Sequence, residues 1–261
     1  MLPPKASLFL LGAQAAGFGT ILVMKPTVLL DAFLFRDPEK WETDASMHLF
    51  CVLGFAFLAF AAIALTASDW SPASQIRMIR CSLLVSLVGL ADCVFTHSIS
   101  KRRLSLGAIT QSALPIIAVH ATNAVLALST PGVLAKLTLD MMRSKHKIVP
   151  ASVMEARCAR ALSIGLIVIG IILIPKPTHG VVFASFPEFA VAEPRVVAIW
   201  CGFALSTLGL VGVFCCTHRR HAPFLNACIL VAIAVCLLRI LIIFCGAFAR
   251  HYKLIMIHNM F

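Results

Sequence analysis

Two ionisable residues stand in the middle of long apolar runs. Asp92 lies within Met78–Phe95, and Arg239 lies within Phe224–Ala249. An ionised group at the centre of a bilayer costs at least about 2.5–3.5 kcal/mol, so each of the two needs a partner. We expect Asp92 and Arg239 to pair with each other as a structural clamp. A proton or ion relay, and partners on another chain, are the alternatives.

His120 and Asn123 are three residues apart, so a helix places both side chains on one face. Inside a membrane such side chains form hydrogen bonds between helices. A histidine can also ligate haem or a pigment, or contact a quinone. A bis-histidine haem needs a second buried histidine at matching depth, whereas His48 and His97 lie at the ends of apolar runs. The pair is therefore predicted to make a polar contact between helices or to a bound ligand.

Lys and Arg residues flank the apolar runs. Lys25 and Lys176 each stand in a Lys-Pro-Thr sequence, where the proline stops a helix and the cation suits its C-terminal carbonyls. Such cations either anchor the topology or bind anionic headgroups. The residues predicted to contact lipid headgroups are Lys25, Lys101, Arg102, Arg103, Lys176, Arg219 and Arg220.

Motifs of catalysis are missing from the sequence. It contains no Walker loop, HExxH, GxSxG or paired intramembrane carboxylates. It also has no CxxC pair, and nearly all of the ten cysteines fall in or beside apolar runs, where cysteine packs as a small apolar residue. We therefore expect no enzymatic activity, no metal site and no cofactor, although a phospholipid such as cardiolipin could be bound.

The composition requires a membrane. The chain has 261 residues, 60% hydrophobic and 13% charged, with a mean hydropathy of +0.96. Soluble domains have roughly 45–50% apolar and about 25% charged residues. Continuous apolar runs of roughly 17–26 residues indicate helices, because barrel strands alternate over ~10 residues. The net charge of +11 suits anionic headgroups, and no segment combines basic and aromatic residues as nucleic-acid binding would require.

The sequence therefore predicts an all-α integral membrane protein with about seven transmembrane helices. The first run has only Lys5 before it, and no A-x-A-like site is followed by a polar mature start, so we expect a retained helix rather than a signal peptide. The predicted spans are Leu8–Met24, Leu49–Ala67, Met78–Phe95, Leu106–Leu128, Ala159–Ile174, Val196–Cys216 and Phe224–Ala249.

An internal repeat relates the first three spans to the last three. The sequence ILVMKPT at 21–27 resembles ILIPKPT at 172–178, at an offset of 151. Cys51 corresponds to Cys201 at an offset of 150, and Cys81 to Cys228 at 147. Because an even number of spans separates the two units, they are predicted to run parallel, related by an axis along the membrane normal.

The fourth span has no full counterpart in the second unit. After the last span only the 12-residue tail Arg250–Phe261 remains, which is too short to cross a bilayer. We therefore expect a 4+3 arrangement from a degenerate duplication. Its parts are a first membrane unit at 1–128, a basic linker at 129–158 and a second unit at 159–261.

The favoured hypothesis is a non-catalytic accessory subunit of a large organellar energy-converting complex, such as a respiratory-chain complex or ATP synthase. The mitochondrial inner membrane is preferred over a plastid membrane. Expected partners are other membrane subunits and anionic lipids, and not nucleic acid. A small transporter or channel that uses the Asp92–Arg239 pair is the alternative, and a membrane enzyme or pigment carrier, which rests on His120, is a third.

Overall fold

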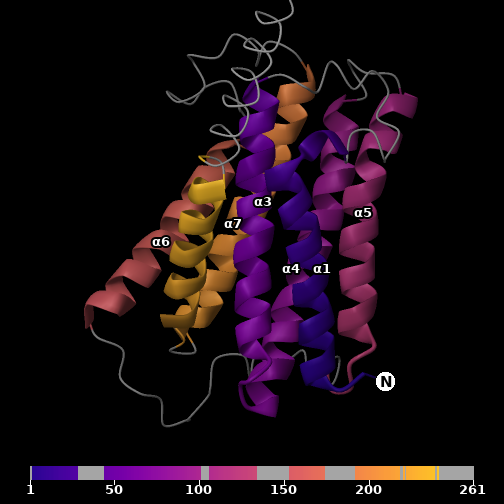
Figure 1. Ribbon diagram of the computed structural model, residues 1–261. Coiled ribbons are helices and arrows are strands. Elements are labelled where there is room, and N and C mark those ends of the chain that lie inside the picture. Colours follow the sequence, from indigo (N-terminus) through magenta and orange to yellow (C-terminus); the bar gives the residue numbers. More distant parts are fainter. Residues whose placement is uncertain are drawn as a thin grey trace, which may run out of the picture.

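The described part of the chain is a bundle of apolar helices. The computed structural model describes residues 2–28, 44–100, 106–133, 153–173, 192–217, 220, 222–238 and 240, with side chains except at 44–45, 92–100, 106–116 and 192–196. These residues are almost all helical and include no β-strand. The helices are α1 (Pro4–Met24), α3 (Asp44–Ala67), α4 (Pro72–Ser100), α5 (Leu106–Leu128), α6 (Val153–Leu173), α7 (Ala192–Thr217) and a shorter helix, Ala222–Leu238 (Figure 1).

The helix ends of α1 follow from local chemistry. Pro4 opens the helix, where a missing N–H costs no hydrogen bond. The helix ends at Met24, the N–H of Lys25 donates to the carbonyl of Ile21 at 3.0 Å, and Pro26 follows. The first Lys-Pro-Thr sequence thus lies at a helix end, as the sequence predicts.

The prediction of an all-helical integral membrane protein is confirmed. Within the described residues, α1, α6 and most of α3, α4 and α7 form five helices long and apolar enough to cross a membrane. The other two predicted spans overlap α5 and the shorter helix Ala222–Leu238, each only partly described. The count of seven crossings therefore stays a prediction.

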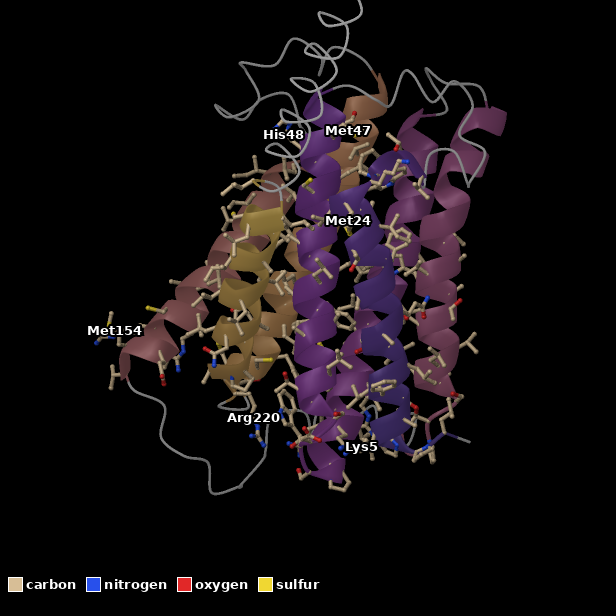
Figure 2. The ribbon with its side chains drawn as sticks, in the orientation of Figure 1. Lys5, Met24, Met47, His48, Met154 and Arg220 are labelled. Atoms are coloured by element: carbon tan, nitrogen blue, oxygen red, sulfur yellow. The ribbon has the colours of Figure 1, made fainter. Side chains whose placement is uncertain are left out.

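The helices form two antiparallel hairpins, α1–α3 and α6–α7, and the second helix of each hairpin contacts that of the other. α1 packs along α3, α6 packs along α7, and α3 meets α7 between the hairpins (Figure 1). α4 and α5 pack against each other on the α1 side. Lys5, Met154 and Arg220 lie at one end of the bundle, and Met47 and His48 at the other (Figure 2). α1 and α6 therefore run in one direction, and α3 and α7 in the opposite one.

In each hairpin a pair of glycines lies at a close approach of the two helices. A Cβ added to Gly19 of α1 would come 2.9 Å from the carbonyl oxygen of Gly54 on α3. A Cβ added to Gly170 of α6 would likewise overlap the carbonyl oxygen of Gly202 on α7. Small residues allow helix backbones to approach this closely, and the van der Waals contact holds helices together in lipid.

These crossings lie at corresponding places in the two hairpins. Gly170 follows Gly19 by 151 residues, and Gly202 follows Gly54 by 148. All five buried residues of α6 stand 151 positions after buried residues of α1; they are Ala159, Ser163, Leu166, Gly170 and Leu173, after Leu8, Gly12, Ala15, Gly19 and Leu22. Between α3 and α7, the two glycines at the crossings are 148 positions apart. At that offset Cys201 corresponds to Leu53 and not, as the sequence suggests, to Cys51.

Candidate functional site

A cavity of about 50 Å³ lies among α3, α4, α5 and α7. It is level with the middle of the helices, since Phe57, Ser86 and His120 lie well inside α3, α4 and α5. Most of its wall is apolar, with a few polar side chains. The lining residues are Leu53, Ala56, Phe57, Phe60, Ser82, Val85, Ser86, Gly89, His120, Asn123, Trp200, Phe203, Ala204, Thr207 and Leu208.

The imidazole ring of His120 is held between α3 and α4. Its centroid lies 6.3 Å from that of the Phe57 ring, which in turn packs edge-on against Phe18 of α1. On the other side the ring lies against Gly89, where an added Cβ would overlap its atoms. Gly89 therefore provides the notch in α4 that the His120 ring occupies.

Asn123 lies one turn further along α5 and lines the same cavity. Its side chain is 6% exposed. Among the described residues, neither Asn123 Oδ1 nor His120 Nδ1 has a hydrogen-bond partner, although both atoms are buried. Buried polar atoms are nearly always paired in native proteins, so these two mark the cavity as a place where something else can bind.

Three buried hydroxyl groups also line the cavity, and each donates its proton to its own helix. Ser82 Oγ donates to the carbonyl of Met78 at 3.0 Å, and Ser86 Oγ to the carbonyl of Ser82 at 2.9 Å. Thr207 Oγ1 donates to the carbonyl of Ala204 at 2.8 Å. With their single protons used in this way, the hydroxyls offer only lone pairs to the cavity.

The serines and the glycine of α4 were not among the residues predicted from the sequence. Ser82, Ser86 and Gly89 follow each other at intervals of four and three, so they lie on one stripe of α4. That stripe of small and polar residues was the available signal. His120 and Asn123, which the sequence does predict to share a face, both line the cavity.

The intramembrane charge pair lies outside what the structure describes. Asp92 belongs to α4, but its side chain is not among those described, and Arg239 is not described. Their pairing stays a prediction. Of the predicted lipid contacts, Lys101, Arg102, Arg103, Lys176 and Arg219 also lie outside the described residues.

Two of the predicted lipid contacts are described. Lys25 is exposed just beyond the end of α1. The guanidinium of Arg220 lies 5.0 Å from the ring centroid of Trp70, and the backbone N–H of Arg220 donates to the carbonyl of Cys215 at 2.7 Å. A cation over an indole face is attracted by the ring. Arg220 therefore contacts the protein itself, and its predicted contact with lipid headgroups stays a prediction.

Other contacts join the helices near that end of the bundle. Lys5 pairs with Asp69 at 3.3 Å, with both side chains largely exposed, so this pair adds little stability. Arg80 donates to the carbonyls of Gly132 and Val133 at 2.6 and 2.9 Å. These bonds tie α4 to the turn that follows α5.

One stripe of α1 makes polar contacts with α5 and with the turn that follows it. Ser7 Oγ and Thr130 Oγ1 are 2.6 Å apart and buried, and Gln14 Nε2 donates to the carbonyl of Val119 at 3.4 Å. Leu11, between Ser7 and Gln14, is fully buried.

The corresponding stripe of α6 is open. At an offset of 151 the residues are Cys158, Leu162 and Gly165. Cys158 is exposed, Leu162 is half-buried, and a Cβ added to Gly165 would meet no atom within 4 Å. Within the described residues this stripe of α6 is therefore less covered than its counterpart in α1, although Leu162 still packs against the core.

A second hollow, of about 280 Å³, lies between α6 and α7. It is lined by Arg160, Ser163, Ile164, Val213, Cys216 and Thr217. Within the part of the chain that the structure describes, no group of three or more His, Cys, Asp or Glu residues is placed to hold a metal ion. Comparison of the chain with protein-family models, with curated proteins and with solved structures found no match.

Proposed function

We propose that this protein is a non-catalytic accessory subunit of a large membrane complex, and that a transmembrane helix of a partner subunit packs on the open stripe of α6. The open stripe, Cys158–Leu162–Gly165, is the observation that carries the proposal. We place the complex in an energy-converting membrane, preferably the mitochondrial inner membrane, because the basic, very apolar chain suits a membrane rich in anionic lipid.

The two hairpins are inferred to descend from duplication of one helical unit. The glycine crossings at corresponding places and the matching buried positions of α1 and α6 both support it. So does the common direction of α1 and α6 (Figure 2). Duplication of a four-helix unit followed by loss of its last helix would give the 4+3 arrangement.

The two hairpins differ in the neighbours that pack on the equivalent stripes of α1 and α6. In the first, Gln14 of α1 bonds to α5, Ser7 bonds to the turn after α5, and Leu11 between them is buried. In the second, the equivalent stripe has no such cover among the described residues, and at its centre Gly165 leaves room for a close backbone approach. Helix association in lipid favours such small residues, since they increase the area of contact. A partner helix in the place of α5 would complete the second unit.

Photo-crosslinking in native membranes tests this interface. We would place photo-leucine at Leu162, and at Ile171 as the matched control, because Ile171 is exposed on another face of α6. We expect residue 162, but not residue 171, to crosslink to a different membrane subunit. Crosslinking to a second copy of this chain, or to lipid alone at both positions, would contradict the proposal.

Native gel electrophoresis with mass spectrometry tests the assignment to a complex. Gently solubilised membranes should carry this chain in a band many times its 28.2 kDa, beside respiratory or ATP-synthase subunits. Migration of the chain by itself, or as a small homo-oligomer, would instead favour a protein that works alone.

A further inference from the structure

We propose that the cavity among α3, α4, α5 and α7 binds the hydroxyl end of a neutral, otherwise apolar molecule, such as a long-chain alcohol, between His120 and Asn123. This inference concerns a different part of the molecule from the open stripe of α6, and it does not depend on the proposed subunit role.

Two buried polar atoms lie in the cavity lining without a hydrogen-bond partner among the described residues. Asn123 is 6% exposed, and its Oδ1 and the Nδ1 of His120 make no hydrogen bond to any described residue. Leaving a polar group unpaired in an apolar environment is unfavourable, because the hydrogen bond that it makes in water is lost. A bundle in lipid has no bulk water at this depth to supply the missing partner. A bound molecule that satisfies both atoms would remove this cost.

The polar side chains that line the cavity determine which hydrogen bonds a ligand can make there. Ser82, Ser86 and Thr207 have given their protons to backbone carbonyls, so they present only oxygen lone pairs. Asn123 Oδ1 is also an acceptor. The lining also carries donors, at Asn123 Nδ2 and Trp200 Nε1, but a ligand that only accepts, such as an ether or an oxidised quinone, would leave Asn123 Oδ1 unpaired.

A hydroxyl group fits both unpaired atoms at once. It carries one donor and two acceptor sites. In the proposed arrangement its proton is donated to Asn123 Oδ1, and its oxygen accepts the proton on Nδ1 of His120. Phe57 and Gly89 on either side of the imidazole hold the ring in position for this bond.

The charge and size of the cavity also restrict the ligand. Among the described residues, the lining contains no Asp, Glu, Lys or Arg, so these residues offer no counter-charge to a carboxylate or an ammonium group. One water needs about 10–15 Å³ on this scale, so about 50 Å³ holds a hydroxyl group and the first carbons attached to it. The apolar remainder of the molecule would extend between the helices, against side chains such as Phe60, Phe203 and Leu208.

The test uses photoaffinity labelling of the full chain in lipid nanodiscs. The probe is dodecan-1-ol carrying a diazirine near its hydroxyl end, and the control is the methyl ether of the same probe, which lacks the donor. Mass spectrometry would locate the labelled residues. Ile164 and Ile171, exposed on α6, provide an internal reference for labelling from the lipid phase.

We expect the alcohol to label cavity residues about two- to tenfold more than the ether does, which corresponds to the net value of one hydrogen bond. Labelling of Ile164 and Ile171 should be the same with both probes. Excess unlabelled dodecan-1-ol should suppress the cavity labelling alone. In the Asn123→Leu variant, which removes the acceptor at similar size, the preference for the alcohol should disappear.

Equal labelling of the cavity by alcohol and ether would overturn the proposal, as would a preference that survives in Asn123→Leu. Labelling only of the α6 reference residues would also overturn it, and would indicate that the cavity holds water or is closed to such molecules. If Asn123→Leu fails to fold, the comparison of the two probes and the competition on the unaltered protein still decide the outcome.

Discussion

The backbone of Gly54 on α3 lies so close to Gly19 on α1 that a Cβ at position 19 would come 2.9 Å from the Gly54 carbonyl oxygen. Gly170 and Gly202 repeat this relationship between α6 and α7. Each crossing has a second close point seven residues away, at Gly12 with Ala61 in one hairpin and at Gly209 with Ser163 in the other. A spacing of seven returns to the same helix face, so both hairpins are held along a continuous seam.

Larger side chains at the seam should open the hairpins. We expect Gly19→Leu and Gly170→Leu each to lower the free energy of unfolding by about 1–3 kcal/mol or more, because overpacking forces backbones apart. Gly17→Leu is the matched control, since a Cβ at Gly17 meets no atom within 4 Å. SDS-induced unfolding in mixed micelles measures the difference. A cost for Gly17→Leu equal to that of Gly19→Leu would show that the crossing is not responsible.

The buried hydrogen bond between Ser7 of α1 and Thr130, in the turn after α5, should respond unequally to the loss of its two partners. Thr130 Oγ1 donates to the Leu126 carbonyl at 3.1 Å, which leaves Ser7 Oγ as the donor to Thr130. Thr130→Val should cost about 1–3 kcal/mol because it leaves a buried donor unpaired, and Ser7→Ala only about 0.5–1.5 kcal/mol. The double variant should cost less than the sum of the two. Strict additivity in unfolding experiments would contradict the direct bond.

Filling the notch in α4 should empty the proposed binding site of its ligand. In Gly89→Ala the new methyl group would displace the His120 ring towards the cavity. We expect the labelling preference for the alcohol over the ether to be lost, with a stability cost of about 1–3 kcal/mol at most. Gly17→Ala, at an open position, should keep the preference. An unchanged preference in Gly89→Ala would show that the His120 ring position does not matter for binding.

Blocking the open stripe of α6 should affect the complex and leave the chain itself intact. Gly165→Leu adds a side chain where nothing lies within 4 Å, so the unfolding free energy of the isolated protein should change by less than about 0.5 kcal/mol. In native gels the same variant should lose the high-mass band. Ile164→Leu, on an exposed neighbouring position, should retain it. Retention of the band by Gly165→Leu would place the partner elsewhere.

The helices themselves could be predicted from the sequence because the apolar runs are long and uninterrupted. Pro4 and the Lys25-Pro26 pair mark both ends of α1 for local reasons. The seam was harder to foresee. Gly19 and Gly54 are unremarkable in an apolar sequence, and only the packing of α1 on α3 makes them neighbours.

The cavity shows the same division. His120 and Asn123 are predicted to share a face from their spacing, because that requires only one helix. Gly89, Trp200 and Thr207 come from two other helices, and the sequence does not specify which helices are adjacent. The hydrogen bonds that use up the protons of Ser82 and Ser86 are likewise visible only in three dimensions.

The seam also bears on how the protein is made. The glycines that face each other across a seam belong to the two helices of one hairpin. These two helices can therefore pair as soon as the second has left the insertion machinery. The hydrogen bonds that hold α5 and its following turn to α1, by contrast, join distant residues. Ser7 and Thr130 are 123 positions apart in the chain, and Gln14 and Val119 are 105 apart. We therefore expect co-translational assembly in two-helix steps, in which α5 docks onto a hairpin already formed, and in which α6 and α7 enter the bilayer as a finished pair.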